Sequence, residues 1–404
     1  MSSLRQLTGA AAAAERWCRP WRVNPGASEI LLLLAATETA AVAGISAAGS
    51  TPASRLQTAA ADAELLVQGP AGRRPHSLPP LPAGVSPALI SQVVVAELGL
   101  VPLVVDLGCA VAPAVAHLRL AGQRSPANCL STGAAMAPQR VEGLLRQGRL
   151  WGERLARAGR PLLIAECVPG GTSSAQALLS GLGLEVAGLV SGSMPAPVHG
   201  LKAELVRRGL AAAGLVSGSE PTGERPDPRR VVAALGDPMQ PLAAALVVAA
   251  ARAGLPLLLA GGSQMAAVLA LALALAPPQQ RPAIAAQVAL GTTAWVADEP
   301  SSDLVELLAR IGAHWDVQPL AFAADLHFGP SCHPALRDYE RGFVKEGVGA
   351  GGLALLWQLA GRSPAALELA CDRACRSLLA GTPSAAVQPP GEDHFGALSI
   401  PGKA

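Results

Sequence analysis

Residues 164–183, IAECVPGGTSSAQALLSGLG, place a short apolar run, a Pro-Gly-Gly turn and an apolar helical pattern in direct succession. The apolar run does not alternate with polar residues, which is typical of a parallel strand covered on both faces. A strand that leads into a helix through such a turn is one half of a βαβ unit. This stretch therefore predicts an α/β fold with a parallel sheet.

The same pattern recurs along most of the chain, with helical patterns such as residues 241–254 between short apolar runs. This alternation predicts a doubly wound parallel sheet with helices on both faces. We expect strands at residues 30–35, 101–106, 161–166, 186–191, 255–260 and 285–290. Residues 69–87 and 217–230 are rich in Pro, Gly and charge, which predicts long surface loops, and a loose tail is expected from residue 383.

Composition and patterning limit the class of protein. With 15% charged residues and a net charge of +2, the chain has no basic stripe, and we expect no nucleic-acid partner. The most apolar stretch, residues 255–276, is interrupted by Gly-Gly-Ser-Gln, which predicts a buried strand and helix and no membrane partner. Seven scattered cysteines without a CxxC pair, and a start too weakly apolar for a signal peptide, favour a cytoplasmic protein.

Glu166 ends the apolar run of the opening stretch. Ligands of open α/β sheets bind beyond the carboxyl ends of the strands, so this carboxylate lies where a ligand would bind. The glycines that follow allow close backbone approach, residues 172–174 can cap the next helix, and its free N–H groups favour a phosphate or carboxylate. The alternative is a plain capped turn with Glu166 as a solvated end residue.

A second glycine-rich acid lies far along the chain, in residues 338–361. Glu346 is followed by Gly at four of the next six positions and then by an apolar helix. Glycines leave a carboxylate approachable, and apolar walls would raise its pKa toward that of a working base. The alternative is that Glu346 only starts the helix. Two acids and one anion site together suggest chemistry on a small phosphorylated molecule.

Other polar residues give weaker signals. Lys202 could reach a phosphate, although a solvated lysine at a helix start is the default interpretation. Asp237 lies where a helix cap is expected. His327 and His333 flank Cys332, but no matching ligand pair occurs elsewhere in the sequence, so we expect no metal site.

Five motifs in order carry a resemblance to a known family. They are ATETAAVAGISAAGSTPA (36–53), TAAADAELL (58–66), AECVPGGTSSAQALLSGLG (165–183), ALGDPMQPLAAALVVAAARAGLPLLLAGGSQM (234–265) and YERGFVKEGVGAGG (339–352). From about residue 30 to about residue 379 the chain resembles the nicotinate-nucleotide:dimethylbenzimidazole phosphoribosyltransferases, in particular their divergent prokaryotic branch.

The resemblance implies an enzyme of the pentosyltransferase class. The family transfers phosphoribose from nicotinate mononucleotide to a lower-ligand base, giving an α-riboside 5′-phosphate for the nucleotide loop of cobalamin, and needs no redox cofactor. It works as a homodimer with a Rossmann-like parallel sheet and a smaller helical domain. The implied division is an N-terminal extension of the helical region (1–29), an α/β core (30–330), a C-terminal helical segment (331–382) and a tail (383–404).

The resemblance also implies roles for single residues. Glu346 matches the catalytic glutamate that takes the proton from the attacking base, and Glu166 matches the acid before the phosphate turn. The implied phosphate-binding residues are Gly170, Gly171, Thr172, Ser173 and Lys202. The chain departs from the family where Lys345 replaces the first Gly of a Gly-Glu-Gly turn.

The chemistry of the substrate agrees with these roles. The ring nitrogen of nicotinate mononucleotide is already cationic, so it leaves without an acid while positive charge builds on the ribose. One carboxylate can stabilise that charge, and a second can deprotonate the incoming base. Two other functions are a non-catalytic nucleotide-binding protein of the cobamide pathway and a scaffold with structural glycine turns. Both acids together favour the transferase, since a binding protein needs no base.

Overall fold

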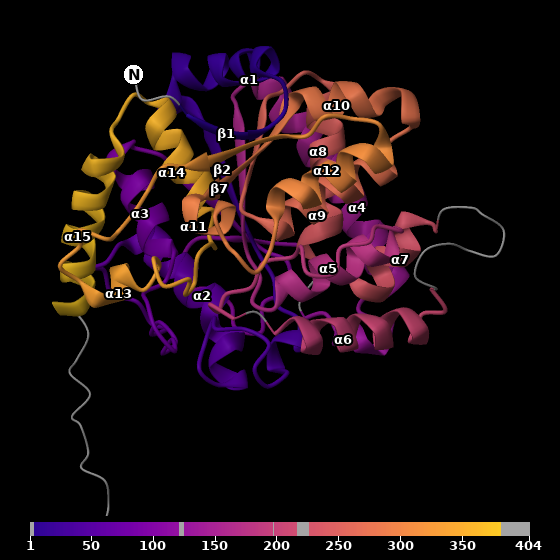
Figure 1. The fold of residues 1–404 in the computed structure, drawn as a ribbon, viewed down its shortest axis with the longest axis horizontal. Coiled ribbons are helices and arrows are strands. Elements are labelled where there is room, and N and C mark those ends of the chain that lie inside the picture. The colour runs from indigo at the N-terminus through magenta and orange to yellow at the C-terminus, as the bar shows by residue number, and fades with distance from the viewer. Residues whose placement is uncertain (1–3, 121–124, 197, 216–225, 381–404) are drawn as a thin grey trace, which may run out of the picture.

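An eight-stranded sheet forms the centre of the protein, and helices cover both of its faces (Figure 1). The computed structural model describes residues 4–120, 125–196, 198–215 and 226–380. The strands are β1 (Arg5–Thr8), β2 (Glu29–Leu34), β3 (Pro102–Asp106), β4 (Leu118–Arg119), β5 (Leu162–Cys167), β6 (Leu257–Ala260), β7 (Val288–Thr293) and β8 (Leu320–Ala324). Their order is β1-β8-β7-β6-β5-β2-β3-β4, and only the β1–β8 pair is antiparallel among them. The predicted α/β fold is confirmed.

The central strands send alternate side chains into two hydrophobic cores. In β2, Leu31 and Leu33 belong to one core, whereas Ile30, Leu32 and Leu34 belong to the other. A strand buried in this way needs apolar residues at every position, which explains the apolar runs of the sequence.

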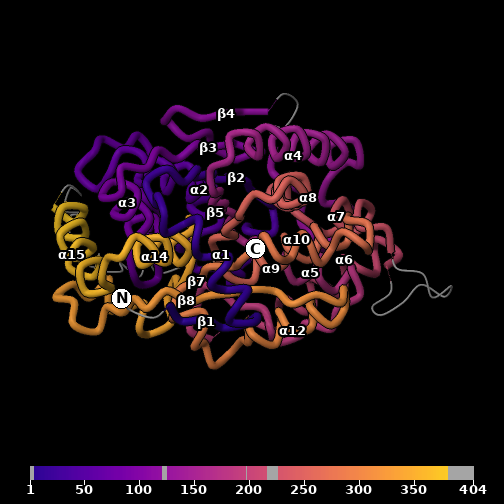
Figure 2. Tube along the Cα trace, turned by 90° about the horizontal axis from the view of Figure 1, so that it is seen from above, coloured from indigo at the N-terminus to yellow at the C-terminus, as the bar shows by residue number. Residues whose placement is uncertain are grey.

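The helices form two layers on opposite sides of the sheet (Figure 2). One layer contains α1 (Ala11–Val23), α2 (Pro52–Gln68), α3 (Ala88–Glu97), α14 (Ala350–Leu359) and α15 (Pro364–Ala380). The other contains α4 (Pro138–Ala158), α5 (Gly171–Gly181), α6 (His199–Ala212), α7 (Pro228–Leu235), α8 (Met239–Arg252), α9 (Ser263–Leu275) and α12 (Leu304–Trp315). Short helices are α10 (Arg281–Gln287), α11 (Ala294–Ala297) and α13 (Pro334–Arg337). Helices from both ends of the chain thus share one layer.

Four predicted strands lie at the expected residues, as β2, β3, β5 and β6. The strand predicted at residues 186–191 is wrong, because this segment forms turns in which Val186 and Val190 are buried without strand pairing. The strand predicted at residues 285–290 begins only at Val288, after the end of α10. Strands β1, β4 and β8 were not predicted.

The predicted loops have different outcomes. Residues 69–87 lie between α2 and α3 and contain no helix or strand, as predicted. In the second predicted loop, residues 217–225 lie outside the described residues, and α7 already begins at Pro228. The predicted tail also lies outside them. Within the described residues, no helix has the length and apolar character needed to cross a membrane.

Candidate active site

A cavity of about 590 Å³ opens at the carboxyl ends of β5 and β6. Glu166 and the turn at residues 168–172 form its wall after β5, and residues 262–264 form it after β6. The loop at residues 77–87 and the turn at residues 344–347 line it from the other helical layer. The cavity therefore brings together the two acids that the sequence singled out.

Glu166 lies at the end of β5 and is 4% exposed. Its Oε2 accepts a hydrogen bond from the backbone N–H of Val168 at 2.9 Å, and its Oε1 accepts one from Gln264 Nε2 at 3.0 Å. The pKa of the Glu166 carboxyl is raised to about 8, chiefly by burial and also by the nearby acids Asp237 and Glu346, while the Val168 hydrogen bond lowers it. The alternative that Glu166 is a solvated residue at the end of the strand is therefore excluded.

The raised pKa of Glu166 has a consequence for stability. A carboxyl with a pKa of about 8 when folded and about 4.5 when unfolded binds a proton more strongly in the folded protein. Between these values the contribution of Glu166 to stability therefore falls as the pH rises.

The variant Glu166→Gln stays neutral at every pH. We therefore expect the melting temperature of the variant minus that of the wild type to be a few degrees larger at pH 8 than at pH 5. Calorimetric melting at both pH values measures this difference, with Glu185→Gln at an exposed position as the control. A difference that does not change with pH would contradict the burial of an ionisable Glu166.

Glu346 is held by donors from two elements. Its Oε1 accepts hydrogen bonds from the N–H groups of Gly347 and Gly351, both at 3.1 Å. Its Oε2 accepts from Thr293 N at 3.1 Å and from Thr292 Oγ1 at 3.2 Å, at the end of β7. Burial raises the pKa of Glu346 to about 7 against these hydrogen bonds. The carboxylate is thus fixed in place and can still take up a proton near neutral pH.

The turn that carries Glu346 has an unusual backbone. Val344, Lys345 and Val348 have φ angles of 65°, 42° and 53°, in the left-handed region that costs a β-branched residue of the order of 1–3 kcal/mol. Backbone hydrogen bonds hold this turn: Val344 N donates to Ser193 O, and Val348 N donates to Glu166 O at 2.9 Å. The last of these bonds joins the two acidic motifs directly.

The glycine turn after β5 differs in one respect from the prediction. Helix α5 begins at Gly171, and its N-cap is Gly170 with a φ of 80° and no side-chain cap, so the predicted caps at residues 172–174 are wrong. A Cβ at Gly171 would lie 1.8 Å from Gln264 Oε1, so a larger residue here would displace the Gln264 side chain that donates to Glu166. Gly170, Gly171 and Thr172 line the cavity, whereas Ser173 is fully buried.

Two further buried acids surround this centre. Asp62 of α2 lines the cavity and accepts hydrogen bonds from Ser86 Oγ at 2.6 Å and Cys167 Sγ at 3.5 Å. Asp237 accepts from Ser174 Oγ at 2.5 Å and from the backbone N–H of Met239 at the start of α8. Burial raises the pKa of each carboxyl to about 6. Sequence reasoning missed Asp62, although an aspartate among alanines on an apolar helix was a visible signal.

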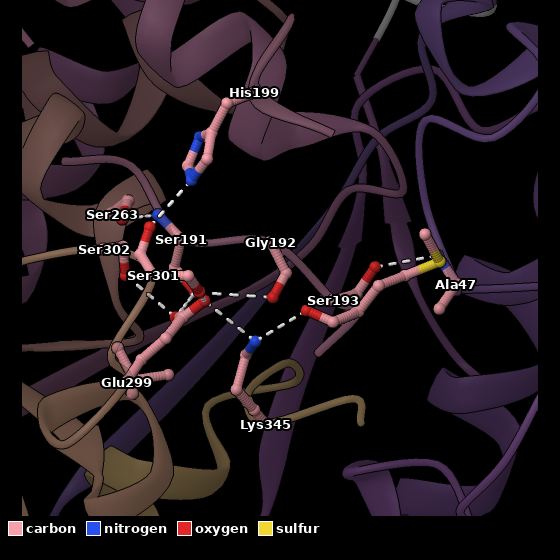
Figure 3. Close-up of polar contacts among 12 residues, drawn as sticks. Ala47, Ser191, Gly192, Ser193, His199, Ser263, Glu299, Ser301, Ser302 and Lys345 are labelled. Carbon is pink, nitrogen blue, oxygen red and sulfur yellow. Dashed lines mark hydrogen bonds and ion pairs between the residues drawn. The ribbon is translucent and has the colours of Figure 1, made fainter. Parts of the chain in front are cut away.

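Lys202 does not face the cavity. It is 1% exposed, and its Nζ donates to the carbonyl oxygen of Ser191 at 2.7 Å. Ser191 in turn donates from its hydroxyl to Glu299, which also binds Ser301, Ser302 and Lys345 (Figure 3). The predicted phosphate contact of Lys202 therefore stays a prediction, and this network around Glu299 was not predicted.

The structure also groups residues in the segment where we expected no metal site. Cys332 and His333 bring ligand atoms within 4.8 Å of each other and of Asp372 in α15, so this trio could hold a metal ion. His327 lies apart from it, 3.6 Å from Asp325 and 3.5 Å from Glu340. No sequence pattern pointed to Asp372, which joins the group from a separate helix.

Comparison with known proteins matches part of this chain to one family. The phosphoribosyltransferase family model DBI_PRT matches residues 88–291, which include β5, the glycine turn and β6. The chain belongs to this phosphoribosyltransferase family. The resemblance drawn from the motifs is thereby confirmed.

This phosphoribosyltransferase has relatives that are similar over most of its sequence. It is 52% identical over 375 residues to a UPF0284 protein of Prochlorococcus marinus (strain MIT 9313), covering 91% of each chain. It is 50% identical to a UPF0284 protein of Parasynechococcus marenigrum (strain WH8102), covering 89% of this chain and 90% of the relative.

Solved structures share its fold. CobT from Thermus thermophilus matches with a TM-score of 0.55 at 20% identity, over 91% of this chain and 92% of CobT. A nicotinate-nucleotide-dimethylbenzimidazole phosphoribosyltransferase from the same organism matches with a TM-score of 0.51 at 21% identity, over 87% and 83% of the two chains.

Proposed function

We propose that this protein transfers the phosphoribosyl group of nicotinate mononucleotide to an aromatic nitrogen base such as dimethylbenzimidazole. The product would be an α-riboside 5′-phosphate for the nucleotide loop of cobalamin. The observation that carries the proposal is the pair of carboxyls with raised pKa values, Glu166 and Glu346, beside the glycine turn in one cavity. Family membership and the CobT-like fold support the same reaction.

In the proposed reaction, the bond between ribose C1′ and the pyridinium nitrogen breaks, and nicotinate leaves with the electron pair. A ring nitrogen of the acceptor then forms the new bond to C1′, and the proton on its other nitrogen passes to Glu346. Glu166 stabilises the positive charge that builds on the ribose, because a carboxylate acts strongly in a buried site. Gly170, Gly171 and Thr172 hold the 5′-phosphate, whose binding energy orients the ribose. We propose that the protein works as a homodimer.

The direct test is to incubate the purified protein with nicotinate mononucleotide and, separately, dimethylbenzimidazole or adenine. Mass spectrometry follows free nicotinate and the riboside phosphate. Nicotinate release that depends on the base supports the transferase and names its acceptor. Nucleotide binding by calorimetry without release would favour the non-catalytic binding protein instead.

The activity should depend on pH in a defined direction. Glu346 can accept a proton only when ionised, and its pKa is about 7. Glu166 must also be ionised to stabilise the ribose charge, and its pKa is about 8. We therefore expect kcat/KM for the acceptor to begin to fall below about pH 8 and to fall by up to about 100-fold per pH unit well below 7, where the ionised fractions of both carboxyls decrease. Measurements of kcat/KM for the acceptor between pH 5.5 and 9, with saturating nucleotide, test this decrease at low pH. A value that does not change with pH would contradict the role of Glu346 as the base.

A further inference from the structure

Lys345, the residue before Glu346, is a positively charged residue of the cavity wall. Lys345 lines the cavity wall next to Gly192 and Ser193, and its side chain is 2% exposed. Its Nζ donates hydrogen bonds to Glu299 Oε1 and to the carbonyl oxygen of Met194, both at 3.0 Å (Figure 3). An ammonium carries three N–H donors, so one donor is left beyond these two contacts.

The charges around residues 191–194 do not balance within the protein. Two lysines, Lys202 and Lys345, are buried here with one carboxylate, Glu299. Burial opposes ionisation of Glu299, but hydrogen bonds from Ser191 and the charge of Lys345 lower its pKa below the usual value, so it is ionised. Burial brings the pKa of Lys202 to about 8, with Glu299 raising it and Lys345 lowering it, so Lys202 is mostly charged at neutral pH. This trio therefore carries one excess positive charge.

A buried excess charge is costly unless an opposite charge compensates it. The cavity offers the place for such a charge, since Lys345 and residues 192–193 line it together with the glycine turn at residues 170–172. Lys202 is bonded to Ser191 O behind this wall. Of the two lysines, Lys345 is the one that is among the residues lining the cavity.

The cavity wall thus carries groups of both signs. The carboxyls of Glu166, Glu346 and Asp62 line it together with Lys345. A ligand with a cationic ring and an anionic phosphate has a partner of opposite charge for each kind of group. Nicotinate mononucleotide has this distribution of charge.

We propose that Lys345 is the cation that binds the 5′-phosphate of the nucleotide, and that Lys202 and Glu299 hold the wall and orient the Lys345 ammonium. This inference rests on the proposed function for the identity of the nucleotide. Lys345 directly precedes the proposed base, Glu346, in the sequence.

The test compares ligands that differ only in the phosphate. Calorimetry measures the binding of nicotinate mononucleotide and of nicotinate riboside to the wild type, Lys345→Met, Lys345→Arg and Lys202→Met. We expect Lys345→Met to weaken mononucleotide binding by about 10- to 100-fold, the loss of one charge-assisted hydrogen bond, and to leave riboside binding unchanged. The ratio of the two affinities defines the preference for the mononucleotide over the riboside. Lys345→Arg should recover part of this preference, and Lys202→Met should lose less of it than Lys345→Met.

Two further variants separate the loss of a phosphate ligand from damage to the cavity wall. Lys345→Met removes the ion-pair partner of Glu299, so the double variant Lys345→Met/Glu299→Gln takes away the whole ion pair and should show the same loss of preference in a folded protein. Arg73, an exposed cation that also lines the cavity, is the matched control, and Arg73→Met should change the preference less than twofold. A preference that survives in Lys345→Met, or that is lost only with Arg73 or Lys202, overturns the inference.

The inference and the proposed function can fail separately. Mononucleotide binding that depends on Lys345 but gives no base-dependent nicotinate release would refute the transferase and keep the phosphate site. Normal turnover with an unchanged half-saturation for the mononucleotide in Lys345→Met would keep the transferase and refute the site. A wild type that binds neither the mononucleotide nor ribose 5-phosphate would refute both.

Discussion

Glu346→Gln is expected to lower kcat for base-dependent nicotinate release by about 10²- to 10⁴-fold, the usual contribution of a general base. Glutamine keeps the length of the side chain, and its one amide oxygen can accept either from Gly351 N or from Thr293 N, so the turn and the fold should remain. The expected loss therefore reflects the missing proton acceptor. Steady-state kinetics measure it, and circular dichroism with nucleotide binding checks that the variant is folded.

An acceptor without an N–H separates the role of a base from a structural role. In 1-methylbenzimidazole the free ring nitrogen can attack C1′, but no proton has to leave. The defect of Glu346→Gln should shrink strongly with this acceptor if Glu346 acts as the base. An equal defect with both acceptors, or normal turnover with dimethylbenzimidazole, would refute that role. Glu185→Gln, at an exposed position, is the control for the loss of one carboxylate.

The strands could be predicted from the sequence where a run of buried apolar residues is also paired with neighbouring strands in the sheet. In β2 and β5 every apolar side chain enters one of two cores, so the apolar run marks the strand. At residues 186–191 the same apolar pattern marks only burial, because hydrogen-bonding partners are not encoded in hydrophobicity. Strand β1 was missed because an edge strand of four residues, RQLT, lacks an apolar run.

The site could be predicted where its residues are neighbours in the sequence. Glu166 and Glu346 each precede glycines whose backbone shapes the turn, and both are found in the cavity. The Lys345–Glu299 pair joins residues 46 positions apart, and a pair of that kind depends on how β7 and α14 approach each other. Nothing in a single sequence records that approach. For the same reason the sequence could not show that the side chain of Lys202 turns to the Ser191 carbonyl.

The other large effect is expected for Glu166→Gln, which should lower kcat by about 10²- to 10³-fold, as for the loss of one group that stabilises charge in a transition state. Glutamine can still accept from Val168 N or Gln264 Nε2, so the end of β5 should keep its shape. Binding of the mononucleotide should change much less than kcat, because the ribose charge that Glu166 stabilises develops only as the bond to nicotinate breaks.

The choice of acceptor distinguishes Glu166 from Glu346. A charge stabiliser acts on the breaking bond, so the defect of Glu166→Gln should be the same with dimethylbenzimidazole and 1-methylbenzimidazole, unlike that of Glu346→Gln. Rapid-quench measurement of nicotinate release in a single turnover gives both rates directly. A Glu166→Gln defect that disappears with the methylated acceptor would make Glu166 the base, and the assignments of the two carboxylates would then have to be exchanged.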